Sequence, residues 1–325
     1  MNLLQIFKKC LIVSIRVSYQ SEGDKMQFEY PLLEALVAVI REGTFEAAAR
    51  ALNVTQSAVS QRLKLLEEKT GAILIVRGRP CVATEYGQKL CRHIEQVHLL
   101  EHDLRKHLKS IDNPTSGAPA TIRIAINSDS LATWFPEAIQ RAGSELNLYL
   151  DIFPDDQEHT AARLRSGEAL AAVTAEASPL HGCRRVALGS MQYVAVATPR
   201  FMATHFRNGV SLQATANAAH LLYDRKDTLL QQWFLDVFGE APPHVGHSVP
   251  SVSGLVACTL NGAAWGLNPR HAVERYIEDG SLVELVPGAT VLVPLYWQSS
   301  GSGSEIMKIL SAIVTDVARK YLVPP

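Results

Sequence analysis

The chain has 325 residues, which at roughly 150 residues per domain predicts two or three domains. Hydrophobic residues make up 47% and charged residues 19%, a globular balance that excludes disorder for most of the chain. The chain has 31 Lys and Arg residues against 32 Asp and Glu residues, so its net charge is -1 and a uniformly basic surface is excluded. Any contact with nucleic acid must therefore come from a local basic patch.

Residues 44–92 form such a patch. They carry eight basic and four acidic side chains, a net charge of +4, which leaves -5 for the rest of the chain. This asymmetry between segments is the first indication of function.

The cysteines and histidines predict neither disulfides nor a metal site. The five cysteines are odd in number and lack CxxC spacing, which favours reduced thiols and a cytoplasmic location. They are Cys10, Cys81, Cys91, Cys183 and Cys258. His98 and His102 have the spacing of metal ligands on a helix, but no third ligand accompanies them. We expect no metal and no cofactor.

No membrane segment is expected. The longest uncharged stretch, residues 246–269, is interrupted by prolines and glycines. Residues 1–25 lack a small-residue cleavage site after their short apolar run, so a secretory signal is disfavoured. We interpret them as a disordered or misassigned extension, with Met26 as an alternative start.

Three helices are predicted between residues 31 and 71. Apolar residues recur at helical spacing from Pro31 until Gly43, where the first helix ends. Thr44 can cap a second helix, and Thr55 can cap a third that ends at Gly71.

The third helix has two different faces. Val59, Leu63 and Leu66 lie within about 60° of arc and form the buried stripe. Short polar side chains face outward, which suits a helix that reads base edges in a major groove, although an ordinary surface helix has the same periodicity. The predicted base-reading residues are Gln56, Ser57, Ser60 and Gln61, and the predicted phosphate-binding residues are Arg62, Lys64, Arg77 and Arg79.

A hairpin and a long helix follow the third helix. Residues 73–76 form a β-like run before Arg77 and Arg79, which predicts a wing with two arginines at its tip. Residues 84–108 then predict one helix capped by Thr84. Its apolar stripe, interrupted by Glu101, comprises Tyr86, Leu90, Ile94, Val97, Leu104 and Leu108. An unpartnered stripe of this kind predicts pairing with a second copy of the chain.

The segments AAARALNVTQSAVSQRLKLLEEKTG, LIVRGR and ATEYG closely resemble the LysR-type transcriptional regulators. Ile75 stands where that family commonly has Phe, and Ala83 where it commonly has Leu; both replacements remain apolar. NSDSLATW at residues 127–134 is similar to the lysine- and arginine-responsive branch, the ArgP/LysG group, also labelled chromosome-initiation inhibitors. The resemblance implies a regulator that binds double-stranded DNA as a homodimer or tetramer, with RNA polymerase as a candidate partner. It also implies a small effector, lysine or arginine, and control of genes for amino-acid export or metabolism.

The C-terminal part alternates apolar runs with helical patterns, which predicts two α/β lobes with a cleft between them. The expected fold is multidomain: an all-α winged helix-turn-helix DNA-binding domain, a long linker helix, and a two-lobed effector domain that resembles periplasmic binding proteins. The predicted boundaries are 26–84 for the DNA-binding domain, 84–110 for the linker helix, 111–120 for the hinge and 121–325 for the effector domain. Lobe 1 is expected at about 121–188 and 290–325, and lobe 2 at about 189–289.

Four residues are predicted to bind the effector. Ser128, Asp129 and Ser130 follow the strand-like run TIRIAI, where hydroxyls can receive a carboxylate, although helix capping explains the same residues. Asp224 follows a strand of the second lobe, where a carboxylate can answer an amine, although a solvated loop is the alternative. Asp227, Ser251 and Ser253 are weaker candidates for the same cleft.

Two rival classes remain. An α/β enzyme would fit the C-terminal fold, but the sequence lacks a P-loop and a GxSxG nucleophile elbow, so we expect no catalytic residues. A nucleoid-associated or replication-origin-binding protein without effector control would fit the N-terminal module. The predicted two-lobed domain makes this second rival less suitable.

Overall fold

The computed structural model describes residues 28–112, 120–155, 160, 163–165, 167–180, 182–224, 228–241, 246–300 and 303–324. The predictions for residues 1–25 and Met26 lie outside these ranges. No helix in the described ranges has the length and apolar character needed to cross a membrane.

The N-terminal module consists of three helices, α2 (Tyr30–Glu42), α3 (Phe45–Ala51) and α4 (Gln56–Thr70). The side chains of Thr44 and Thr55 accept hydrogen bonds from the third residue of α3 and of α4. Gly43 and Gly71 end α2 and α4 in the left-handed conformation that favours glycine. The predicted caps and stops of these helices are thus confirmed.

The wing follows α4. Strands β1 (Ile75–Val76) and β2 (Val82–Ala83) pair antiparallel, and the two wing arginines lie in the turn between them. Thr84 joins the wing to the next helix, since its hydroxyl accepts from the Gly87 amide and donates to the Ile73 carbonyl. A Cβ at Gly87 would lie 2.1 Å from the Leu74 carbonyl oxygen, so only glycine allows this approach.

Helix α5 (Glu85–Asp112) has three faces, which corrects the predicted stripe. Ile94 is fully buried in the core of the N-terminal module and is therefore not part of an exposed seam. Leu90 and Val97 are half-buried against the same core. Tyr86, Leu100 and Leu104 remain exposed and lie within about 40° of arc. The side chain of Leu108 lies outside the described residues.

In the residues that the structure describes, the C-terminal part is built on one mixed sheet of nine strands. The path of the sheet is β4-β3-β5-β11-β6-β9-β7-β8, with β10 paired to β6. Lobe 1 contains the parallel strands β3 (Ala120–Asn127), β4 (Leu148–Asp155) and β5 (Ala171–Thr174). Lobe 2 contains β7 (His220–Leu222), β8 (His247–Ser248), β9 (Trp265–Pro269) and β10 (Val283–Glu284).

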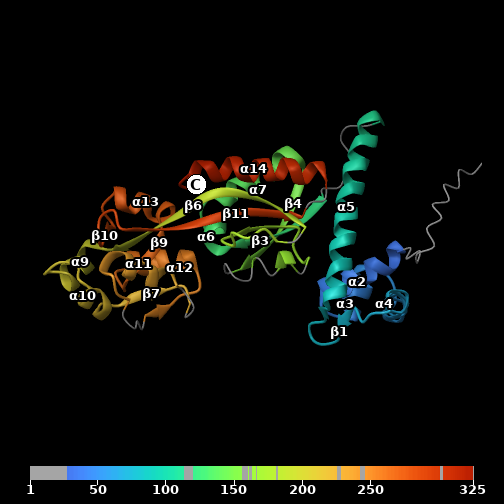
Figure 1. The fold of residues 1–325 in the computed structure, drawn as a ribbon, viewed down its shortest axis with the longest axis horizontal. Coiled ribbons are helices and arrows are strands. Elements are labelled where there is room, and N and C mark those ends of the chain that lie inside the picture. The colour runs from blue at the N-terminus through green and yellow to red at the C-terminus, as the bar shows by residue number, and fades with distance from the viewer. Residues whose placement is uncertain are drawn as a thin grey trace, which may run out of the picture.

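Two long antiparallel strands, β6 (Cys183–Ala197) and β11 (Thr290–Ser300), run through both lobes. Figure 1 shows them crossing the middle of the elongated C-terminal part. The helices of lobe 1 are α6 (Ser128–Ala132), α7 (Phe135–Leu146) and α14 (Glu305–Tyr321). Those of lobe 2 are α9 (Pro199–His205), α10 (Leu212–Asn217), α11 (Leu229–Phe238), α12 (Val252–Leu260) and α13 (Arg270–Glu278). The predicted multidomain fold is confirmed.

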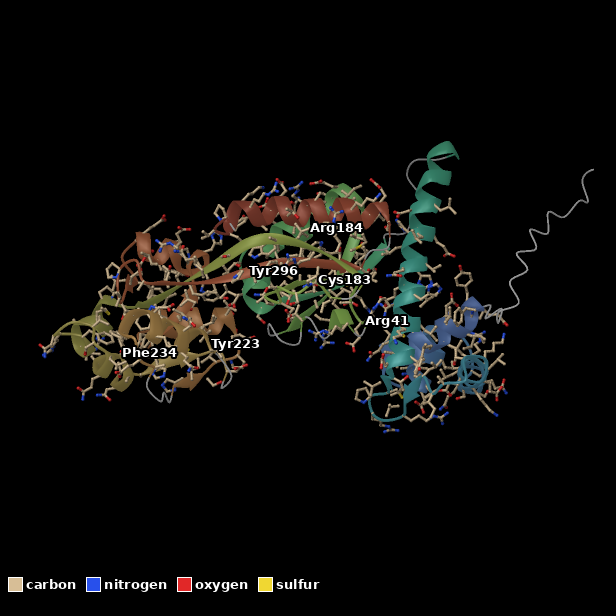
Figure 2. All side chains as sticks on the ribbon, viewed as in Figure 1. Arg41, Cys183, Arg184, Tyr223, Phe234 and Tyr296 are labelled. Carbon is tan, nitrogen blue, oxygen red and sulfur yellow. The ribbon has the colours of Figure 1, made fainter. Side chains whose placement is uncertain are left out.

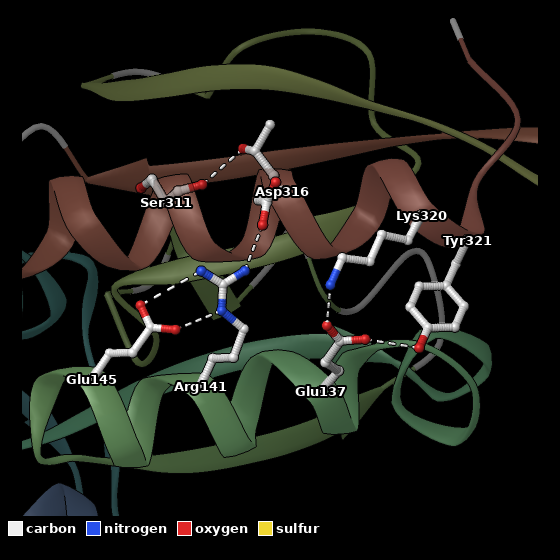
Figure 3. A network of polar contacts seen from close by, with 8 residues as sticks. Glu137, Arg141, Glu145, Ser311, Asp316, Lys320 and Tyr321 are labelled. Carbon is white, nitrogen blue, oxygen red and sulfur yellow. Dashed lines mark hydrogen bonds and ion pairs between the residues drawn. The ribbon is translucent and has the colours of Figure 1, made fainter.

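Helices α7 and α14 are joined by an ionic network on the surface of lobe 1 (Figure 3). Arg141 donates to Glu145 at 2.6 Å and to Asp316 at 2.5 Å. Glu137 accepts from Lys320 and from the Tyr321 hydroxyl. The network therefore holds α14 against α7.

Helix α5 also contacts lobe 1 of its own chain. Arg123 of β3 lies between Glu95 of α5, at 3.6 Å, and Asp151 of β4, at 3.2 Å. The side chains of Glu95 and Arg123 are each only 15% exposed. Burial raises the pKa of Glu95 to about 7, although Arg123 and Arg41 act in the opposite direction.

We predict that the effect of Glu95→Gln on stability depends on pH. Because the pKa of Glu95 is raised, the folded protein binds this proton more tightly than the unfolded chain, and stability is lost as the pH rises from about 4.5 to about 7. Glutamine carries no charge to desolvate. The unfolding free energy of the variant minus that of the wild type should be about 2–3 kcal/mol more positive at pH 8 than at pH 5.

Urea unfolding at the two pH values measures this difference. Glu145→Gln, which removes a carboxylate from the surface network on α7, is the control and should show no such difference. An equal effect of Glu95→Gln at both pH values would contradict the prediction.

Candidate nucleic-acid interface and interlobe cleft

Helix α4 presents polar side chains on the face opposite its buried stripe. Val59, Leu63 and Leu66 are at most 2% exposed and anchor the helix in the module core. Ser57, Gln61 and Lys64 are exposed on the opposite face; Gln56 is exposed at the start of the helix, whereas Ser60 and Arg62 are half-buried at the edges. This face is narrow and polar, as a helix in a major groove requires.

The base-reading candidates differ in their partners. Gln56 donates to Glu46 of α3 at 3.2 Å, and the Ser57 hydroxyl is 2.9 Å from that of Thr55. Gln61 is exposed and makes no side-chain hydrogen bond within the described part of the chain. Its amide is therefore available to pair with a base, and we propose it as the central reading residue.

The wing lies beside the start of α3. The Arg77 guanidinium is 5.4 Å from the centroid of the Phe45 ring, so a cation–π contact positions this arginine. Arg79 is exposed. Lys64 lies 3.6 Å from Glu68, an exposed pair that water and salt weaken. These three cations lie around the polar face of α4 or on the adjacent wing, as phosphate contacts require.

The second site lies where β3 ends and α6 begins. The Tyr223 hydroxyl, from lobe 2, donates to Ser128 Oγ at 2.9 Å. Figure 2 shows Tyr223 where lobe 2 faces lobe 1. The Tyr193 hydroxyl, on the crossing strand β6, donates to Asp129 at 2.6 Å. Ser128 and Asp129 thus lie at the junction of the two lobes, which these hydrogen bonds join; we call this junction the interlobe cleft.

Several buried polar atoms around this cleft have no hydrogen-bond partner. Both side-chain atoms of Asn127 and the hydroxyl of Ser130 are buried and unpaired, and these residues are 2% and 0% exposed. Asn268 Oδ1, on β9 in lobe 2, is also buried and unpaired. A buried polar group without a partner costs about 1–3 kcal/mol, so such groups indicate a place for a polar ligand or water.

The remaining cleft candidates are placed differently. Asp224 is half-buried directly after Tyr223. Ser251 is exposed and its hydroxyl caps α12. Asp227 lies outside the described residues. Sequence reasoning did not single out Asn127, Tyr193 or Tyr223; of these, only Asn127 belongs to the recognised motif.

Two cavities in the described structure lie away from these residues. One, of about 720 Å³, lies between α14 and the ends of β6 and β11; the other, of about 270 Å³, lies between α13 and the end of α14. Neither is lined by the residues at the end of β3. The cleft is therefore identified by its polar atoms and not by its volume.

Family models match both parts of the chain. Residues 31–88 match the bacterial regulatory helix-turn-helix protein, lysR family, and residues 115–318 match the LysR substrate binding domain. Together these matches cover most of the chain.

Individual proteins agree with the family models. The chain is 42% identical over 284 residues to the HTH-type transcriptional regulator ArgP of Pseudomonas aeruginosa, covering 87% of this chain and 94% of that one. It is similar in structure to ArgP from Mycobacterium tuberculosis, with a TM-score of 0.80, 37% identity, and coverage of 92% and 100%. It is also similar to full-length LysG from Corynebacterium glutamicum with bound effector Arg, with a TM-score of 0.72, 33% identity, and coverage of 91% and 100%.

We predict that Gln61 and Arg79 contribute differently to DNA binding. Gln61→Ala should reduce discrimination by about 1–3 kcal/mol at particular base pairs, because a side-chain amide reads base edges. Arg79→Ala should weaken binding to all sequences alike and reduce the salt slope by about 1, because phosphates carry no sequence information.

Binding titrations against a set of single-base variants, at several salt concentrations, separate the two effects. Lys308→Ala, which removes an exposed lysine from α14, is the control. Unchanged preference in Gln61→Ala together with an unchanged salt slope in Arg79→Ala would show that α4 and the wing do not contact DNA in this way.

Proposed function

Because the chain belongs to the LysR family of transcriptional regulators, we propose that a basic amino acid, lysine or arginine, binds in its interlobe cleft and controls its action on DNA. Regulation of transcription through DNA binding is the function of the family. What we propose beyond this family function is the identity of the ligand, its place in the cleft and the kind of genes controlled. We place the protein in the cytoplasm, at genes for amino-acid export or metabolism.

The observation that carries this proposal is the group of polar atoms at the end of β3. Asn127 and Ser130 offer buried, unpaired polar atoms, and Asp129 offers a carboxylate beside them. An amino acid carries both an α-carboxylate and an α-ammonium, so it needs donors and a carboxylate in one small volume. The similar LysG structure contains arginine, which supports a basic amino acid.

We propose the following arrangement in the cleft. The α-carboxylate of the ligand accepts hydrogen bonds from Ser128, Ser130 and the Asn127 amide. Asp129 accepts from an ammonium group, and the Tyr193 hydroxyl orients this carboxylate at 2.6 Å. Asp224, next to Tyr223 in lobe 2, forms an ion pair with the second cationic group of the ligand. Each such hydrogen bond to a charged group contributes about 1.5–3 kcal/mol.

The hydrogen bond between Tyr223 and Ser128 gives the ligand a route to regulation. In the structure it joins the lobes directly. A ligand carboxylate beside Ser128 is a stronger acceptor than the serine hydroxyl and competes with it for the Tyr223 O–H, so binding replaces a lobe-to-lobe contact by a lobe-to-ligand contact. The relative position of the lobes then depends on occupancy, which is what a ligand-controlled regulator needs.

We predict that affinity depends on the distal cation of the ligand. Norleucine has the aliphatic chain of lysine without its ε-ammonium, so it cannot form the proposed charged hydrogen bond to the distal carboxylate. It should bind about 10- to 150-fold more weakly than lysine, which corresponds to about 1.5–3 kcal/mol. Asp129→Asn and Asp224→Asn should each weaken the binding of lysine and arginine by a similar factor.

Calorimetry on the full chain tests these expectations, with Asp316→Asn as the control, since Asp316 pairs with Arg141 outside the cleft. Equal affinity for norleucine and lysine, or undiminished lysine binding in both cleft variants, would refute the proposed cleft chemistry.

We also propose that a second copy of the chain covers the exposed face of α5. Tyr86, Leu100 and Leu104 are 63%, 47% and 57% exposed on one side of this helix. Contact with the same face of α5 in a second copy of the chain would bury them. This pairing would give the homodimer that is typical of the family. Further pairing through effector domains would give a tetramer, and RNA polymerase is the proposed partner at the promoter.

Combined Leu100→Glu and Leu104→Glu should convert the assembly to a smaller species and weaken operator binding, because two half-sites require two linked recognition helices. Light scattering measures the mass, and Leu235→Glu, at a leucine of lobe 2 that is 43% exposed, is the matched control. Retention of the full mass by the double variant would rule out this face.

A further inference from the structure

A third face of α5, about 120° around the helix from its exposed leucines, contacts lobe 1 of the same chain. Four residues of this face, Arg92, Glu95, Leu99 and Asp103, lie within about 80° of arc. Figure 1 shows α5 standing beside the end of the sheet in lobe 1. We call this contact the linker seam.

The centre of the linker seam is a buried cluster of charges. Arg123 of β3 is shared between Glu95 of α5 and Asp151 of β4. Glu95 Oε2 is buried without a hydrogen bond, so the pairing of this carboxylate depends on Arg123. Removal of the arginine leaves a buried carboxylate without its partner, which disfavours the docked arrangement.

Both ends of the linker seam use backbone groups of the effector domain. At one end, Arg92 donates to the Arg165 carbonyl, and a Cβ on Gly167 would lie 2.8 Å from Arg92 Cβ. At the other end, Asp103 accepts from Ser304 Oγ at 2.7 Å and from the Glu305 amide at 2.9 Å.

An apolar contact lies between these polar ends. Leu99 is 3% exposed and packs in the main core of the effector domain, not in the core of the DNA-binding module. A helix of the DNA-binding half therefore contributes a side chain to the effector-domain core. Contacts of this variety, over three turns of α5, define one orientation of the helix.

We propose that the linker seam is a coupling joint that holds the DNA-binding module in one orientation on its own effector domain, with Arg123 as the positioning residue. Because α5 carries the recognition helix at one end and the linker seam along its side, opening of the seam changes where α4 can reach. The inference does not depend on which ligand occupies the cleft.

Two variants open the linker seam from independent points. Arg123→Gln removes the central cation, and Asp103→Ala removes the acceptor of the Glu305 amide. Neither residue belongs to the proposed DNA interface or to the proposed cleft ligands. Arg141→Gln is the matched control, because Arg141 also pairs with two carboxylates but only within lobe 1.

Hydrogen–deuterium exchange of the full chain measures docking directly. Both seam variants should speed exchange of the Glu305 amide by about tenfold or more, because this amide donates its hydrogen bond to Asp103 across the linker seam. The control should leave this amide unchanged. Exchange at the wild-type rate in Arg123→Gln would overturn the proposal.

Operator binding without added ligand measures the consequence. The probe is the duplex that the wild-type protein enriches from a random-sequence pool. We expect both seam variants to change its affinity fivefold or more, in the same direction, and the control to change it less than twofold. If exchange shows that the linker seam is open in both variants but their operator affinity is unchanged, the proposed coupling is wrong. This outcome is independent of whether calorimetry finds that arginine binds in the cleft.

Discussion

The arrangement of the effector domain depends on the antiparallel pairing of β6 with β11. This ladder runs from Thr290 opposite Val194 to Ser300 opposite Cys183, and both lobes are built on it. Its register shifts between Leu295 and Tyr296, opposite Gly189, where the chain passes from one lobe to the other. A Cβ on Gly189 would lie 2.6 Å from the Val323 carbonyl oxygen, and Ser190 exchanges two backbone hydrogen bonds with Val323. Val323 thus holds the backbone of β6 in place beside this register shift.

Local chemistry explains which parts of the fold were predictable. Thr44, Thr55 and Thr84 act within three residues of themselves, so their capping is visible in the sequence alone. The burial of Ile94 was not visible, because periodicity identifies an apolar stripe but not which of several neighbours covers it. Tyr193 and Tyr223 reach residues 64 and 95 positions away, and only the tertiary fold brings those partners together. The motif around Ser128 located the cleft, whereas the residues that join the lobes there required the structure.

Burying the unpaired polar groups of the proposed cleft costs folding free energy, which agrees with a ligand site at this place. Asn127 and Ser130 are buried with unpaired atoms in a region where apolar residues would pack without penalty. Local violations of packing rules concentrate where a protein meets a ligand. The polar face of α4 is a second example, because the exposed Gln61 does not contribute to the core of the DNA-binding module. Sites are therefore found where the chain departs from what stability alone would select.

One strand connects the two proposals. Side chains alternate along β3, so Arg123, Ala125 and Asn127 project from one face while Ile122, Ile124 and Ile126 fill the main core on the other. Arg123 belongs to the linker seam and Asn127 to the cleft, and the fully buried Ala125 is the one residue of this face between them. Filling of the proposed cleft at Asn127 therefore acts on the same strand that carries Arg123 into the linker seam. Since interiors are close-packed and the strand is paired on both sides, any shift moves β3 with its neighbours β4 and β5 as a unit. Asp151 on β4 then moves together with Arg123, and the partner left behind is Glu95 on α5, so the linker seam is where the motion is taken up.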